Sequence, residues 1–265
     1  MKAIPIFTVD AFTDIPYSGN PNGVCILDKI MPDKWMQNVA EELKLSDTAF
    51  LLKKGHAEYD LRWFTPELEV DLCGSATLAS AHILWELGII EKDESIVFNT
   101  KSGILSAESV VDGIILDFPI VETPAIKPPD GLLKALNLDE GLPAFDGNSY
   151  TLVEIDSAEK LLAVAPDFGA LKKVDTLGVI VTAKGSGDVD FVSRFFAPAA
   201  GFDEDPVTGS AHTRLANYWS RKLGKTKMRA KQLSRRGGSL MVEVFGDRVK
   251  ITGKAVTVIK GELCY

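Results

Sequence analysis

Two short stretches of the chain have the residue types that bind anions at the start of a helix. The first is Cys-Gly-Ser-Ala at residues 73–76, and the second is Thr-Gly-Ser-Ala at residues 208–211. Glycine lets a ligand come close to the backbone, and the first turn of a helix leaves about four amide N–H groups without a helical partner. Each stretch is therefore a candidate seat for a carboxylate, with the serine hydroxyl as a further donor.

These stretches are part of a longer internal repeat. Arg62–Pro66 precedes the first stretch and Arg194–Pro198 precedes the second, and both read Arg-x-Phe-x-Pro. Downstream, the segment 103–108 resembles the segment 238–243. The correspondences keep their order and lie roughly 135 residues apart, about half the chain length. We therefore predict two related halves, and if a pseudo-twofold axis relates them, both seats face one cleft.

The composition excludes several classes of protein. The net charge of −8 argues against general nucleic-acid binding, and we expect the basic run 221–236 to be a solvated surface. No apolar run approaches the ~20 residues that cross a bilayer. The apolar run at the start of the sequence is too short, and polar residues follow it too early, for a signal peptide. The three cysteines lack CxxC spacing. This predicts reduced thiols, a cytoplasmic location and no metal site.

Apolar periodicity predicts the elements that hold the two seats. The segment 75–87 is apolar on nearly every side, which predicts a helix buried all round. Short strands are predicted around it, and the economical arrangement is a strongly curved sheet wrapped around this helix. The predicted elements of this half are strands 5–12, 24–27, 49–52, 58–64, 96–98, 103–108 and 114–118, a helix 33–43, and a breaker-rich loop 14–23.

The proline-rich stretch 119–131 is the best candidate for a domain boundary. It predicts an N-terminal lobe at 1–118 and a C-terminal lobe at 130–260, with residues 260–265 as candidates to return to the first lobe. The second helix is expected to run from residue 210 to about 223. Asp47 lies on a bend between helix 33–43 and strand 49–52, where an aspartate more often closes a turn than does chemistry.

Seven motifs lie along nearly the whole chain: Val9–Phe12, Gly19–Pro21, Leu45–Phe50, Phe64–Pro66, Cys73–Leu78, Asp205–Ala211 and Gln232–Gly238. Together they resemble the phenazine-biosynthesis (PhzF-like) isomerase family of the diaminopimelate epimerase-like superfamily. The resemblance implies an α+β fold of two similar halves, each a strongly curved, mostly antiparallel sheet wrapped around a central helix, with the active-site cleft between them. It also implies a homodimer that isomerises a small carboxylate substrate without a cofactor.

The resemblance also implies roles for individual residues. Asp47 becomes the catalytic acid/base, in place of a turn residue, and Asp205 is the second catalytic carboxylate. The implied substrate-binding residues are Ser46, Gly74, Ser75, Gly209 and Ser210. The family usually has Glu where Asp47 stands, and its phenazine-making members have His where Ser75 stands. We therefore expect the reaction class and not the phenazine precursor as substrate.

Two alternatives remain open from the sequence. One is a non-catalytic ligand-binding or protein-interaction member of the same fold. The other is a two-thiol racemase, but Thr208 stands where a second thiol is needed, and a threonine hydroxyl cannot act as a base of matched pKa. Cys73 is then expected to be a bystander. Two places are open for His212, the cleft and the surface, and we expect the surface because a lone histidine on a helix is more often found there.

Overall fold

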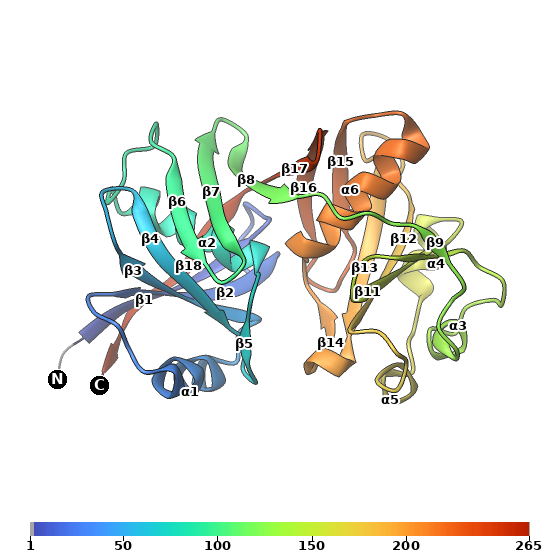
Figure 1. The fold of residues 1–265 in the computed structure, drawn as a ribbon, viewed down its shortest axis with the longest axis horizontal. Coiled ribbons are helices and arrows are strands. Elements are labelled where there is room, and N and C mark those ends of the chain that lie inside the picture. The colour runs from blue at the N-terminus through green and yellow to red at the C-terminus, as the bar shows by residue number, and fades with distance from the viewer. Residues whose placement is uncertain (1–2, 265) are drawn as a thin grey trace. The chain divides into compact units, whose positions relative to one another are not determined.

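The computed structural model describes residues 3–264, and the chain divides into two compact units (Figure 1). The first unit runs to Phe118 and includes the chain again from Lys250, while the second is Pro119–Val249. The sequence placed this return at about residue 260. It begins earlier because β18 (Ala255–Cys264) pairs antiparallel with β1 (Ala3–Ala11) along its whole length.

Within residues 3–264, the first unit contains strands β1–β8 and β18, together with the two helices α1 and α2. Pairing along its sheet is antiparallel for β1–β2, parallel for β2–β3, antiparallel for β3–β4, parallel for β4–β6, and antiparallel for β6–β7 and β7–β8. The short strand β5 (Glu69–Val70) pairs with β4. The other elements are β2 (Asn20–Leu27), α1 (Asp33–Leu43), β3 (Asp47–Lys53), β4 (Glu58–Phe64), α2 (Gly74–Glu86), β6 (Ile96–Thr100), β7 (Gly103–Val110) and β8 (Gly113–Pro119).

Helix α2 occupies the core of this unit. Every residue of the helix except His82 and Glu86 is buried, and it packs against β1, β2, β3 and β18. Its buried hydroxyl groups are satisfied within the helix, since Thr77 Oγ1 donates to the Cys73 carbonyl at 2.5 Å and Ser80 Oγ to the Ala76 carbonyl at 2.7 Å. The predicted all-round burial is therefore confirmed. Helix α1 packs through Met36 and Ala40 into a second apolar cluster of this unit.

The second unit repeats the same order of strand pairings. Pairing is antiparallel for β10–β11, parallel for β11–β12, antiparallel for β12–β13, parallel for β13–β15 and antiparallel for β15–β16. Helix α6 (Gly209–Leu223) lies before the second parallel crossover, as α2 does in the first unit. The strands are β10 (Ala144–Asp146), β11 (Tyr150–Glu154), β12 (Gly178–Lys184), β13 (Phe191–Ala197), β15 (Lys227–Gln232) and β16 (Gly238–Phe245). Strand β17 (Arg248–Gly253) begins in this unit and continues into the first.

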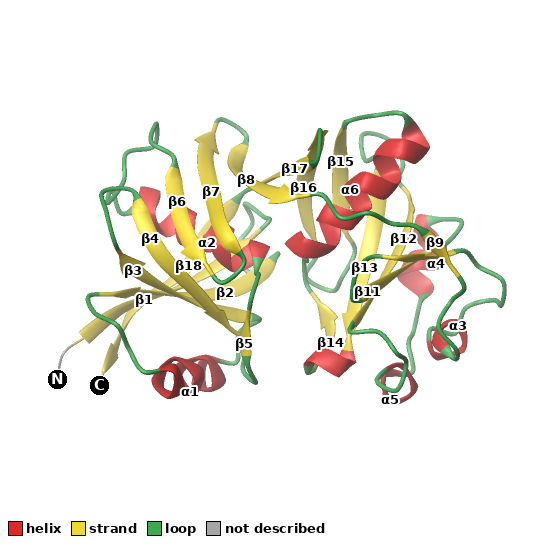
Figure 2. Ribbon diagram, viewed as in Figure 1, coloured by secondary structure: helices red, strands yellow, loops and turns green. Residues whose placement is uncertain are grey.

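The sheet of the second unit has helices on both faces, and successive residues of its strands point to opposite faces. Thr182 of β12 accepts a hydrogen bond from Trp219 of α6 at 3.0 Å, and Trp219 stacks on Phe191 of β13 at 5.9 Å. Val179 and Val181 of β12 point the other way, into a cluster with residues of the short helices. Those are α3 (Leu132–Ala135), α4 (Ala158–Ala163) and α5 (Phe168–Leu171), and the remaining pieces are β9 (Ala125–Ile126), a 3₁₀ turn (Pro198–Ala200) and β14 (Phe202–Asp205). Figure 2 shows that strands dominate each unit.

One sequence expectation is wrong. The breaker-rich segment 14–23 is not all loop, because β2 already begins at Asn20. Pro21 fits the start of this strand, since it lacks an N–H to pair while its carbonyl accepts the Ser46 amide at 3.2 Å.

The basic run 221–236 contains β15, whose basic residues alternate with buried Met228, Ala230 and Gln232. Most of its basic side chains are exposed, as expected of a solvated surface, and Arg221 and Lys222 lie in the last turn of α6. Five of the basic residues are ion-paired: Arg221–Glu122, Lys222–Glu154, Lys225–Asp190, Lys227–Glu243 and Arg229–Asp188. The run therefore joins the end of α6 to a surface strand, and five of its eight charges are balanced by ion pairs.

Candidate functional site

Asp47 is the first residue of β3, and its carboxylate contacts the start of α2. The thiol of Cys73, the N-cap residue of α2, donates to Asp47 Oδ2 at 3.1 Å. The same sulfur accepts the amide N–H of Ala76, in the first turn of the helix, at 3.5 Å. The predicted acid/base is thus half-buried and held at the end of the most buried helix of the unit.

Cys73 is a donor in this arrangement. Burial raises the pKa of the Cys73 thiol well above its usual value, and the negative charge of Asp47 raises it further. A thiol with a raised pKa stays protonated at neutral pH, so it donates a hydrogen bond and does not serve as a thiolate nucleophile. Cys73, expected to be a bystander, therefore contacts the candidate catalytic carboxylate as a protonated donor.

The hydroxyl of Ser75 is used within the protein. Ser75 Oγ donates to Asn22 Oδ1 at 3.1 Å, and Asn22 lies opposite Asp47 in the parallel pairing of β2 and β3. Asn22 is held in turn, since its Nδ2 donates to the Asn20 carbonyl at 2.8 Å. The backbone amides at Gly74 and Ser75 therefore remain as the donors that this seat offers to a ligand.

Sequence reasoning missed Asn22 because it treated the segment around it as loop. The only signal was its place beside the Gly19–Pro21 motif. Ser46, predicted to bind substrate, lies next to Asp47, and its amide ties the start of β3 to Pro21 of β2.

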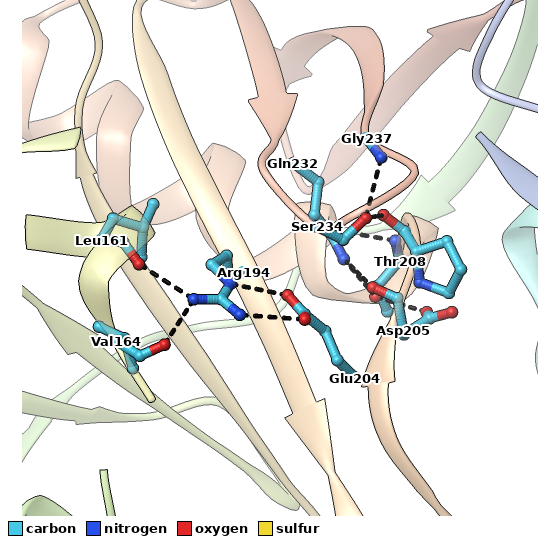
Figure 3. Close-up of polar contacts among 10 residues, drawn as sticks. Leu161, Val164, Arg194, Glu204, Asp205, Thr208, Gln232, Ser234 and Gly237 are labelled. Atoms are coloured by element: carbon cyan, nitrogen blue, oxygen red, sulfur yellow. Dashed lines mark hydrogen bonds and ion pairs between the residues drawn. The ribbon is translucent and has the colours of Figure 1, made fainter. Parts of the chain in front are cut away.

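In the second unit, Asp205 ends β14 and Thr208 is the N-cap residue of α6. Thr208 Oγ1 donates to Asp205 Oδ2 at 2.5 Å. Gln232 of β15 supports both residues, because its Nε2 donates to Thr208 Oγ1 at 3.1 Å and to the Asp205 carbonyl at 2.8 Å (Figure 3). Its Oε1 accepts the Thr208 amide at 2.9 Å. Gln232 lies in the motif Gln232–Gly238, but the sequence did not predict its role.

An ion pair holds the strand that carries Asp205. Arg194 of β13 forms two hydrogen bonds to Glu204, the residue before Asp205, at 2.7 and 3.0 Å (Figure 3). Its third nitrogen donates to the Leu161 and Val164 carbonyls at 3.2 and 2.7 Å, and the guanidinium lies over the ring of Phe196.

The first unit contains the same device, since Arg62 forms two bonds to Glu69 at 2.7 and 2.8 Å and its guanidinium lies over the ring of Phe64. The arginine and phenylalanine of the repeated Arg-x-Phe-x-Pro motif therefore have the same structural role in both units.

Gly209 and Ser210 begin α6, as predicted for the second seat. The Ser210 carbonyl accepts Thr213 Oγ1 at 2.8 Å and Arg214 Nη1 at 2.7 Å, which anchors this turn to the next. The side chain of the N-cap residue, Thr208, does not cap the amides of this helix start. Because Thr208 donates to Asp205 and accepts from Gln232, its hydroxyl does not serve as the cap.

The expectation that His212 is a surface residue is wrong. His212 is 0% exposed, and its Nδ1 lies 2.7 Å from the Thr208 carbonyl. Burial lowers the pKa of His212 to about 4, so the ring is neutral at pH 7 and Nδ1 carries the proton that it donates to this carbonyl. Its Nε2 has no hydrogen-bond partner within residues 3–264.

Two further observations concern the described part of the chain. No helix within it is long and apolar enough to span a membrane. No group of three or more His, Cys, Asp or Glu residues within it is placed to hold a metal ion.

Comparison with known proteins identifies the family. The family model described as phenazine biosynthesis-like protein, PhzC-PhzF, matches residues 9–261. The chain belongs to the PhzC-PhzF family. An uncharacterized isomerase of Halalkalibacterium halodurans is similar to this PhzC-PhzF member, with 49% identity over 99% of both chains.

The structure agrees with this assignment. The crystal structure of a PhzF-family protein from Enterococcus faecalis superposes with a TM-score of 0.93 at 41% identity, and the match covers 100% of both chains. A hydroxyproline epimerase from Agrobacterium vitis superposes with a TM-score of 0.62 at 14% identity, over 98% of this chain and 92% of that one. This second likeness concerns the fold alone, which is of the diaminopimelate epimerase-like type.

Proposed function

We propose that this protein is an isomerase that moves a proton within a small carboxylate substrate, with Asp47 as the acid/base and no cofactor. Membership of the PhzC-PhzF family and the name of its Halalkalibacterium relative, an uncharacterized isomerase, support the reaction class. The observation that carries the proposal is the position of Asp47: a half-buried carboxylate contacts the N-cap residue of a buried helix whose first amides can hold an anion.

The proposed reaction needs only proton transfers. Asp47 takes a proton from a carbon next to a group that can delocalise the electron pair, and the C–H electrons shift into that conjugated system. The protonated carboxyl then returns the proton to another carbon, so substrate and product are isomers and no electrons are gained or lost. A positioned acid/base of this kind contributes about 10²–10⁴ in rate.

The first seat supplies charge stabilisation. The backbone amides at Gly74 and Ser75 and the positive end of α2, equivalent to roughly half an elementary charge, would hold the substrate carboxylate. Ser75 contributes through its amide, because its hydroxyl donates to Asn22. In the second unit, Gly209 and Ser210 begin α6 and are proposed to bind the substrate in the same way, with Asp205 as the second catalytic carboxylate.

Three predictions from the sequence stay predictions and form part of this proposal. They are a clamp with one seat from each unit, curved sheets wrapped around α2 and α6, and a cytoplasmic homodimer. Light scattering of the purified protein measures its mass in solution and tests the dimer.

The test begins with ligands. A library of small carboxylates is screened by thermal shift, and each hit is then incubated with enzyme in D₂O and followed by proton NMR. The library includes β,γ-unsaturated acids, because their acidic C–H lies between a carboxylate and a double bond that can accept the electron pair. We expect at least one hit to exchange a C–H for deuterium and to give an isomer.

The alternative from the sequence is a ligand-binding protein that has lost the chemistry. Its basis in the structure is the commitment of the Ser75 hydroxyl to Asn22, which removes one donor from the seat. Hits that shift the melting temperature but show neither exchange nor isomerisation, across the whole library, would favour this alternative over the isomerase.

A further inference from the structure

Each candidate catalytic carboxylate accepts a hydrogen bond from the N-cap side chain of a long helix. Cys73 Sγ donates to Asp47 Oδ2 at 3.1 Å in the first unit, and Thr208 Oγ1 donates to Asp205 Oδ2 at 2.5 Å in the second. The two carboxylates reach these positions from different places in the sequence, since Asp47 lies on a strand far upstream of Cys73 and Asp205 lies three residues before Thr208. The shared feature is thus the contact and not the local sequence.

The N-cap atom is itself held by an N–H donor in both units. In the first unit the Ala76 amide donates to Cys73 Sγ at 3.5 Å. In the second, Gln232 Nε2 donates to Thr208 Oγ1 at 3.1 Å. Both units therefore contain a chain of the form N–H to X–H to carboxylate, where X is sulfur or oxygen. A donor that accepts a hydrogen bond is polarised by it and donates more strongly.

We propose that Cys73 and Thr208 are positioning residues of the reaction, each orienting one carboxylate through its S–H or O–H. This inference rests on the proposed function for its catalytic meaning, but the contacts it uses do not. A carboxylate rotates freely about its last bond unless hydrogen bonds fix its plane. Cys73 is suited to fix Asp47 because its sulfur is buried and is anchored to the first turn of α2.

The alternatives for Cys73 fit less well. As a nucleophile or base it would need to ionise, and both burial and the adjacent charge of Asp47 oppose that. Asp47 is the charged residue in contact with the thiol, and the other contacts, Ser75 and the Ala76 amide, are neutral. As simple core packing it would have no reason to direct its hydrogen at a carboxylate.

The first experiment is independent of any substrate. Raman spectra of a Cys25→Ala/Cys264→Ala background isolate the S–H stretching band of Cys73. We expect this band at the low frequency of a hydrogen-bonded thiol, and we expect it to move to higher frequency when Asp47→Asn weakens the acceptor. An S–H band that Asp47→Asn leaves unmoved would overturn the inference.

The second experiment uses a substrate from the carboxylate screen. Cys73→Ala removes the donor and is expected to lower kcat by roughly 10- to 100-fold with little change in KM, because a misplaced catalytic group costs rate and not binding. Cys73→Ser keeps a donor and is expected to recover most of kcat. Cys25→Ala, the matched loss of a buried thiol away from the site, should keep the wild-type rate.

The outcomes separate the two proposals. If Cys73→Ala keeps full kcat, or if Cys73→Ser is as slow as Cys73→Ala, the positioning role is wrong even though the isomerase stands. If Asp47→Asn keeps full activity while its S–H band moves, the contact exists but the proposed function of Asp47 fails. Thr208→Val should lower kcat in the same way, since valine keeps the shape of threonine and lacks the hydroxyl.

Discussion

The ion pair between Arg194 and Glu204 should contribute more to stability than any exposed pair of the second unit. Its side chains are only 13% and 21% exposed, and the guanidinium also serves two backbone carbonyls and the Phe196 ring. The substitution Arg194→Met keeps an apolar stem on that ring and removes the charge. It leaves Glu204 as a poorly hydrated charge without its partner, a situation that typically costs ~3–5 kcal/mol.

We therefore expect Arg194→Met to lower the free energy of unfolding by about 4 kcal/mol. If the free energy of unfolding falls by about 2 kcal/mol per molar urea, the midpoint of urea unfolding falls by about 2 M. Two units need not unfold together, so hydrogen exchange of peptides from β12 and β13 identifies the transition of the second unit.

Two comparisons isolate the cause of the loss. Glu204→Gln in the Arg194→Met background removes the orphaned charge and should recover part of the stability. Arg229→Met is the matched control, because its pair with Asp188 is 64% and 77% exposed and should be worth less than about 1 kcal/mol. The reasoning is refuted if Arg194→Met and Arg229→Met cost the same, or if Glu204→Gln gives no recovery.

Three further predictions concern single side chains. His212 has a pKa of about 4 in the folded state against 6.5 for the free side chain, so the unfolded state binds more protons between these values. Stability therefore falls by roughly 2 kcal/mol from pH 7 to pH 5 on this account, and urea titrations at both pH values should show a shallower fall for His212→Asn. Gly178→Ala places a Cβ 2.5 Å from Phe195 Cζ, and the overpacking should cost ~1–3 kcal/mol in urea unfolding. Ser75→Ala leaves Asn22 Oδ1 buried without its donor, so we expect a loss of ~1–3 kcal/mol but unchanged ligand affinity by calorimetry.

Helices and strands with strong periodicity were predictable from the sequence. The helix 33–43 and the strand 58–64 have the bounds of α1 and β4, and the all-round apolar segment became the buried α2. The short strands β5, β9, β10 and β14 were not found, because two to four residues show no periodicity and their pairing depends on distant partners. Strand β15 was hidden by its charges, which face solvent at every second residue.

The site was only partly predictable. Local sequence placed Asp47 between a helix and a strand, and Gly74 and Gly209 at the starts of helices, because these features depend on neighbouring residues. Nothing local connects Asp47 with Cys73, since their contact requires β3 to lie beside the start of α2. For the same reason the sequence could not predict that Asn22 contacts Ser75 or that Gln232 contacts Asp205 and Thr208. Burial of His212 depends on the ring of Phe191 and not on its own helix.

The measurement that tests the central claim most directly is deuterium incorporation from D₂O into a substrate, followed by mass spectrometry for wild type, Asp47→Asn and Asp93→Asn. Asp93 lies on an exposed turn of the same unit and controls for the loss of one carboxylate. If Asp47 is the acid/base, Asp47→Asn slows incorporation by at least about 100-fold while Asp93→Asn keeps the wild-type rate. Incorporation by Asp47→Asn at the wild-type rate would contradict the account.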